Sequence, residues 1–205
     1  VADVAGKGIP AALLVSTAVM TAAGEMTYPV MSGFKWQRIY YGPLASPISP
    51  GQIAFGHLLA VSFRFIAQAT VFWGLMQLFG ASASGTSWLV IPVGVLSALS
   101  FASLLQAYAA TRRDEGFQFA FIQRFIVMPM FLFAGTFFEL TAMPVYLRWI
   151  GWLSPVWHGT ELARVANYGR ELAPGMAWVH VGYLLALLAL GLVLANRNYR
   201  RRLAE

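Results

Sequence analysis

The length of its apolar runs is the feature that most constrains how this chain can fold. Residues 176–195, MAWVHVGYLLALLALGLVLA, contain no Asp, Glu, Lys or Arg. Roughly 20 predominantly apolar residues in an α-helix, rising 1.5 Å per residue, are enough to cross a bilayer core about 30 Å thick. This run is therefore expected to be a membrane-spanning helix.

Four further runs have comparable length and composition, at 10–31, 57–79, 88–110 and 117–138. A membrane barrel strand would need only about 10 residues and would alternate apolar with polar positions, which these runs do not. Helices also satisfy every backbone N–H and C=O group internally, as lipid requires. We therefore expect an all-α fold in which residues 1–205 form one polytopic transmembrane bundle of five spans.

The composition excludes several functional classes. Hydrophobic residues make up 59% of the chain and charged residues 11%, whereas soluble domains carry about 25% charged residues. The net charge of +6 lies at the ends of the apolar runs and forms no basic face, so the expected partner is the lipid bilayer and not nucleic acid. Without Cys and with three dispersed His, the chain is expected to have no metal site and to bind no cofactor.

Basic residues are distributed unevenly between the two sets of loops. Eight lie in the tail after 195, the loop 111–116 and the loop 33–56, against three in the segment 139–175 and Lys7. The positive-inside rule places the richer set, with the C-terminus, in the cytoplasm of a bacterial cell membrane. Five spans then leave the N-terminus outside, and we expect a sixth span upstream.

The loop 33–56 carries FKWQRIYYGPLASPISPGQ, an aromatic and basic stretch followed by closely spaced prolines. Proline prevents a continuous helix and stiffens the segment. Two interpretations stay open: an interfacial helix on lipid headgroups, or a docking surface for a cytoplasmic partner. The candidate contact residues are Phe34, Lys35, Arg38, Tyr40, Tyr41 and Pro47.

The run at 117–138 is followed by an aromatic, half-polar segment, 139–175, with Trp149, Trp152 and Trp157. Trp prefers the membrane–water interface. We expect short helices that re-enter the outer leaflet, and the alternative is a surface amphipathic helix with no role in transport. The candidate outer-gate residues are Gly135, Glu139, His158 and Glu161.

Four polar residues fall inside the apolar runs: Glu25, Arg64, Gln68 and Arg124. A charge at mid-helix costs about 2.5–3.5 kcal/mol on insertion scales. The two Arg are close enough to a helix end to snorkel, whereas Glu25 is expected to pair with one of them or to line a pathway.

Two stretches resemble type-2 ATP-binding-cassette export permeases, most closely the nodulation-type lipo-oligosaccharide exporters and the antibiotic-resistance permeases. The first is TYPVMSGFKWQRIYYGPLASPISPGQIAFGHLL, with the family's aromatic-basic stub and PL-SP element. The second is MFLFAGTFFELTAMPVYLRWIGWLSPVWHGTELAR, which is similar to the SGTFFP element and the later PL-HAVELAR stretch, with Ala134 in place of Ser and Glu139 near the usual Pro.

The resemblance implies that the loop at 33–50 fits a groove in a separate ATPase subunit and that two permease copies form the pathway. It also implies re-entrant helices near the exit, and an amphiphilic cargo, either a lipid-linked saccharide or a hydrophobic drug. ATP and Mg²⁺ would be bound by the partner, since AGKGIP lacks the G-x-x-x-x-G-K-[ST] spacing of a Walker motif.

Two functions other than transport compete with this interpretation. VADVAGKGIPAAL is similar to an element of metal-dependent serine phosphatases, with Asp3, Gly6, Lys7 and Gly8 in register. That family needs several distant Asp residues, and the only other Asp here is Asp114. A membrane scaffold or receptor without transport is the second rival, and co-purification with an ATPase discriminates it.

Overall fold

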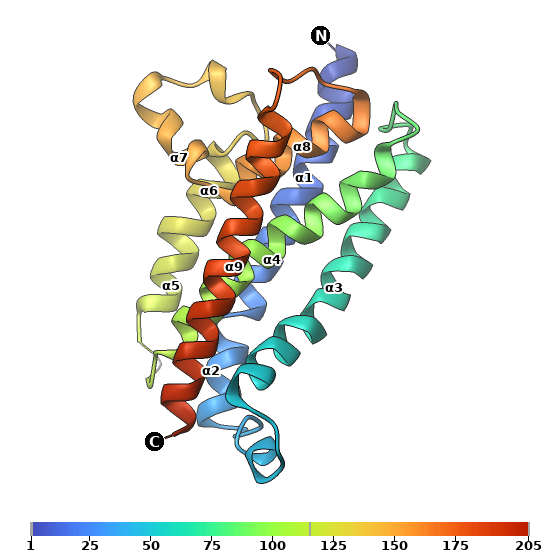
Figure 1. Cartoon of the computed structure of the whole chain (residues 1–205). Helices are drawn as coiled ribbons and strands as arrows, with labels where there is room; N and C mark the ends of the chain where they lie inside the picture. The colour runs from blue at the N-terminus through green and yellow to red at the C-terminus, as the bar shows by residue number, and fades with distance from the viewer. Residues whose placement is uncertain (1, 115, 205) are drawn as a thin grey trace.

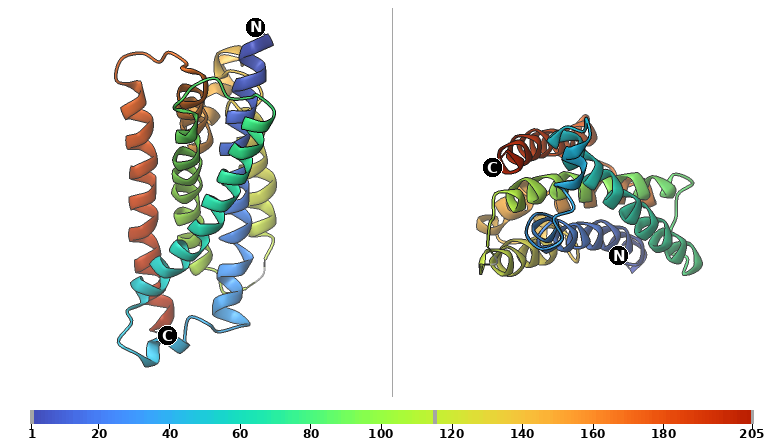
Figure 2. Two further views of the ribbon diagram at one scale, coloured as in Figure 1. Left: turned by 90° about the vertical axis from the view of Figure 1, so that its right-hand side faces the viewer. Right: turned by 90° about the horizontal axis from the view of Figure 1, so that it is seen from below.

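The computed structural model describes residues 2–114 and 116–204, and every regular element within them is helical. The long helices run side by side in an elongated bundle (Figure 1). The N-terminus lies at one end of the bundle and the C-terminus at the other (Figure 2), and we call these ends the N-terminal face and the C-terminal face. The predicted all-α class is confirmed.

The helices follow one another along the chain, with short 3₁₀ or π turns between them. Their bounds are α1 (Ala2–Glu25), α2 (Tyr28–Lys35), η1 (Gly42–Ala45), α3 (Pro50–Leu78), η2 (Ser87–Leu89), α4 (Val90–Ala110), α5 (Gln118–Ile122), η3 (Gln123–Val127), α6 (Met128–Phe133), η4 (Leu140–Ala142), η5 (Val145–Leu147), α7 (Arg148–Trp152), α8 (Pro155–Tyr168) and α9 (Met176–Leu203).

Four stretches of the described chain are long and apolar enough to cross a membrane: Gly6–Lys35, Pro50–Leu78, Ser87–Ala110 and Met176–Leu203. They coincide with four of the five predicted runs. The remaining run, 117–138, forms a shorter apolar helix that ends at Phe133, because Gly135 takes a left-handed φ of +85°. The predicted helical membrane bundle is confirmed at this coarser level.

Local signals explain where the elements begin and end. Pro29 stands four residues after Glu25, so its ring would clash with that carbonyl, and the helix breaks between α1 and α2. Ser49 and Gln52 form a capping box at the start of α3, with Pro50 at the first helical position. For this reason α3 begins at Pro50, earlier than the predicted start at His57.

Helix α4 occupies the centre of the bundle and packs against α1, α3, α8 and α9. Its buried stripe contains Ser97, Ser100 and Ser103, whose hydroxyls donate to carbonyls of the preceding turn. Small residues let helix backbones approach closely where lipid provides no hydrophobic driving force between helices. At Gly191 of α9 an added Cβ would lie only 2.7 Å from the backbone nitrogen of Leu104.

The outer surface of the bundle is apolar. Large side chains such as Phe63, Phe125 and Val193 are at least 60% exposed, on α3, the η3 turn and α9 respectively. Large exposed apolar surfaces mark contacts with a membrane or with other proteins. The surface therefore agrees with a multi-pass membrane protein.

Candidate functional site

At the C-terminal face, an aromatic cluster ties the segment after α2 to the end of α9. The rings of Phe34, Tyr40 and Tyr199 have centroids 4.7 to 5.3 Å apart, and all three are buried. The guanidinium of Arg202 lies 4.1 Å from the Phe34 ring centroid. The predicted contact residues Phe34 and Tyr40 thus hold the loop in place from inside.

The other four predicted contact residues are exposed on this face. Lys35 pairs with Asp114 across 3.1 Å, Arg38 has a φ of +51°, and Tyr41 and Pro47 flank the η1 turn. A positive φ is rare for a residue with a side chain and marks a tight turn. The loop thus divides into buried anchors and outward-facing side chains.

The close approach of Tyr40 to α2 requires glycine at position 33. A Cβ there would lie 2.6 Å from the Tyr40 ring atom Cζ, whereas at Gly24 of α1 it would meet nothing within 4 Å. We expect Gly33→Ala to destabilise the protein by about 1–3 kcal/mol through overpacking. Thermal unfolding in detergent checks this, with Gly24→Ala as the matched control. Equal unfolding temperatures for the two variants would contradict the packing at Tyr40.

The polar residues within the apolar runs take different environments. Nη1 of Arg64 lies 2.7 and 2.8 Å from the two carboxylate oxygens of Glu25, joining α3 to the end of α1. Gln68 lies one turn further along α3 and is half-buried, while Arg124 lies exposed within the π-helical turn. The structure thus pairs Glu25 with Arg64 and leaves Arg124 at the surface.

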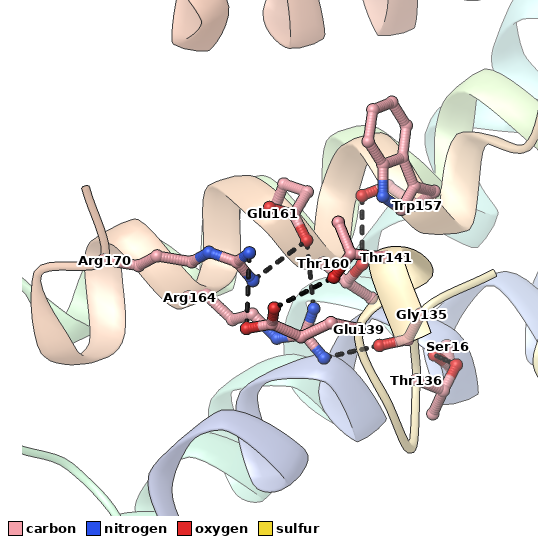
Figure 3. Close-up of polar contacts among 10 residues, drawn as sticks. All are labelled: Ser16, Gly135, Thr136, Glu139, Thr141, Trp157, Thr160, Glu161, Arg164 and Arg170. Atoms are coloured by element: carbon pink, nitrogen blue, oxygen red, sulfur yellow. Dashed lines mark hydrogen bonds and ion pairs between the residues drawn. The ribbon is translucent and has the colours of Figure 1, made fainter. Parts of the chain in front are cut away.

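A network of charged side chains closes the N-terminal face (Figure 3). Glu161 of α8 is 3.0 Å from Nη1 of Arg164 and 3.2 Å from Nη1 of Arg170, and Arg170 also reaches Glu139 at 3.3 Å. Glu161 and Arg164 are about 95% buried, and Arg164 donates a hydrogen bond to the carbonyl of Gly135. Three of the four predicted outer residues, Gly135, Glu139 and Glu161, thus meet in one cluster.

The fourth outer residue, His158, joins α8 to α9 instead. Its Nδ1 lies 2.8 Å from Nδ1 of His180, and its Nε2 lies 3.1 Å from the carbonyl of Trp152. A carbonyl only accepts, so Nε2 of His158 carries a proton. Burial lowers the pKa of His158 to about 4. At neutral pH this ring is therefore uncharged, and its Nδ1 accepts from the Nδ1–H of His180.

We expect this pair to make the stability of the protein sensitive to acid. The folded-state pKa of His158 is below the unfolded value of about 6.5, so its contribution is complete above pH 6.5 and is lost as the pH falls towards 4. We expect the unfolding temperature to fall over this range, and to fall less steeply in His158→Gln. Identical pH profiles for the two proteins would contradict the assignment.

Sequence reasoning missed several partners because they come from distant parts of the chain. The outer cluster also contains Arg164 and Arg170, which pair with Glu161. The Tyr40 ring packs on Tyr199, whose hydroxyl accepts a hydrogen bond from Gln106. The stretch HGTELAR could have indicated the pairing of Glu161 with Arg164, since residues three apart lie on the same face of a helix. Among the described residues, no three His, Asp or Glu side chains come together as a metal site would require.

Comparisons with known proteins decide the family. A model of the ABC-2 type transporter family matches residues 4–168. The chain belongs to this family. Its relatives include Nodulation protein J of Rhizobium leguminosarum bv. viciae, 26% identical over 94% of this chain and 74% of the relative. The probable multidrug ABC transporter permease YbhR of Escherichia coli K12 is 26% identical over 78% of this chain and 43% of YbhR.

No solved structure matches the chain. Membership of the ABC-2 family makes the protein a multi-pass membrane permease subunit of an ATP-binding-cassette exporter. Permeases of this family associate with an ATPase subunit. The resemblance drawn from the two sequence stretches is therefore confirmed.

Proposed function

We propose that this ABC-2 permease moves an amphiphilic molecule out of the cytoplasm, driven by ATP hydrolysis on a separate subunit that docks on the exposed part of the loop 36–49. ATP and Mg²⁺ are bound by that subunit, and this chain has no ATPase site of its own. Two permease copies surround the pathway. The cargo class is a lipid-linked saccharide or a hydrophobic drug, and the relative YbhR is named as a probable multidrug permease.

The observation that carries this proposal is the construction of the loop. The buried rings of Phe34 and Tyr40 pack on Tyr199 at the end of α9. A displacement of the exposed Tyr41 or Pro47 by a bound subunit would therefore also move the backbones of α2 and α9. Burial also raises the pKa of Tyr40 to about 12, so its hydroxyl stays protonated. A loop held by contacts on both sides can transmit force, as a loosely held one cannot.

The distribution of charge supports the orientation that we propose. Helix α9 ends with Arg200, Arg201 and Arg202 on the C-terminal face, which also carries Lys35 and Arg38. By the positive-inside rule this face is cytoplasmic in a bacterial cell membrane. On this view Gln118–Phe133 is a fifth crossing, because it runs from the C-terminal face to the segment before α8 (Figure 1). Helices α7 and α8 then form the outer re-entrant segment.

ATPase activity in proteoliposomes tests the proposal. We expect the permease to stimulate hydrolysis by its ATPase subunit, and Tyr41→Ala combined with Pro47→Ala to reduce this stimulation at least about fivefold, as expected for loss of contacts worth more than 1 kcal/mol. Tyr146→Ala is the control, because Tyr146 is 74% exposed in the η5 turn directly before α7, and α7 lies towards the N-terminal face (Figure 1). Unchanged stimulation in the double variant would favour the interfacial-helix interpretation. No stimulation by the unaltered protein would favour a scaffold or receptor.

A further inference from the structure

An open groove of about 550 Å³ lies near the C-terminal face, between α1 and α2 on one side and the first half of α3 on the other. This volume is within the range of about 300–1,000 Å³ found for small-molecule sites. Its lining includes Glu25, Tyr28, Ser32, Trp36, His57 and Arg64. Trp36 also belongs to the loop 36–49 to which we assign ATPase docking, whereas Tyr41 and Pro47 do not line the groove.

Two aromatic rings form the apolar part of the groove. Tyr28 is 45% exposed and is held by edge contact with the ring of Phe119, 5.1 Å away between centroids. Trp36, at the C-cap of the same helix α2, is 50% exposed and also lines the groove. Aromatic side chains half-open to a groove offer flat apolar faces, beside which a polar tip can hydrogen-bond.

The two charged side chains of the groove form an ion pair, so together they carry no net charge. Glu25 and Arg64 face each other at 2.7 Å, and this ion pair involves only Nη1 of the guanidinium. The Arg64 side chain is 68% exposed, and a guanidinium carries five N–H donors in a planar fork. The Glu25–Arg64 pair thus offers hydrogen-bond donors and acceptors at one place. Because it has no net charge, it does not favour a charged ligand.

A series of polar and ring contacts leads from the core to His57 in the groove. Nε2 of Gln106 donates to the carbonyl of Ala54 at 2.8 Å, which fixes the orientation of the amide, and also donates to the Tyr199 hydroxyl at 3.3 Å. The Tyr199 ring packs on that of Tyr40, and the Tyr40 hydroxyl lies 3.1 Å from Nδ1 of His57.

His57 has one ring nitrogen without a partner among the described side chains. Its Nδ1 lies within hydrogen-bond distance of the Tyr40 hydroxyl, whereas its Nε2 is buried without a hydrogen-bond partner. His57 lines the groove, so a ligand group that both donates and accepts can satisfy this nitrogen in either tautomer.

We propose that this groove binds the uncharged carbohydrate headgroup of the amphiphile before export. Sugar hydroxyls both donate and accept, so they can satisfy Nε2 of His57 in either tautomer, the N–H groups of Arg64 outside the ion pair, and the Glu25 carboxylate. Sugar rings present flat C–H faces to Trp36 and Tyr28. An ionic headgroup would instead require an unpaired opposite charge, and Glu25 and Arg64 neutralise each other. The inference rests on the proposed function, since it takes the cargo to be an amphiphile.

Photolabelling in liposomes that contain the full chain tests this site. The probe is a lactosyl lipid with a diazirine on its acyl chain, and the comparison lipid has the same chain under a phosphocholine headgroup. We expect saturable labelling near residues 25–64 by the lactosyl probe alone, with competition by unlabelled lactosyl lipid. Trp36→Ala should reduce the saturable part at least about fivefold, while Trp178→Ala, at an 80% exposed position on α9, should not.

A second variant guards against indirect effects. Ala60→Trp places a large ring in the groove from an exposed position on α3 and should also abolish saturable labelling. Equal labelling by the two lipids, or labelling unaffected by both Trp36→Ala and Ala60→Trp, would overturn the carbohydrate site. The proposed function would survive that result if the loop variant Tyr41→Ala with Pro47→Ala still uncoupled the ATPase, so the two failures can be told apart.

Discussion

Replacement of Arg164 by Met is expected to lower the free energy of unfolding by about 3–5 kcal/mol, the cost of breaking a buried ion pair by removing one partner. Arg164 and Glu161 are both about 95% buried, and Arg164 also satisfies the carbonyl of Gly135 at the left-handed turn after α6. The variant leaves that carbonyl without its donor and weakens the neutralisation of Glu161. Chemical denaturation in detergent micelles measures the effect.

A double variant separates the ion pair from the packing around it. Arg164→Met with Glu161→Leu should be less destabilising than the sum of the two single variants, because neither charge is then left buried. Lys35→Met provides the control, since Lys35 and Asp114 form an exposed pair at 3.1 Å whose loss should cost no more than about 1 kcal/mol. Strict additivity in the double variant would show that the two side chains do not act as a pair.

The second large effect is expected at the contact between α4 and α9. Gly191→Leu should destabilise the protein by about 3 kcal/mol or more, because its Cβ would lie 2.7 Å from the backbone nitrogen of Leu104, which cannot move aside as a flexible side chain could. Gly182→Leu on the same helix meets nothing within 4 Å and should be neutral or stabilising through helix propensity. Thermal unfolding of both variants gives the comparison, and similar losses would place α9 further from α4.

The spans could be predicted from the sequence because lipid imposes both a length and a composition on them. Small residues favour close helix packing, and Ser97, Ser100 and Ser103 of the central run 88–110 are fully buried. The early start of α3 could have been found from the Ser49 and Gln52 capping pattern. The shorter helix within 117–138 depends on the conformation of Gly135, which a hydropathy pattern does not encode.

The candidate sites were less accessible to sequence reasoning. The sequence allowed Glu25 to pair with Arg64 or with Arg124, and only the tertiary structure identifies Arg64 as the partner. The same holds for Tyr199 under Tyr40 and for His180 beside His158, since both contacts join residues that tertiary packing alone brings together. Which of the loop residues face outward, Tyr41 but not Tyr40, follows from the close approach at Gly33.

We propose that the loop 36–49 meets an ATPase in the cytoplasm, and side-specific cysteine labelling is the sharpest test of this orientation. The chain contains no Cys, so single variants report one position each. Tyr41→Cys should be protected from a membrane-impermeant maleimide in intact cells and react only after permeabilisation, while Tyr146→Cys should react in intact cells. The reverse pattern, with Tyr41→Cys labelled from outside, would contradict the account.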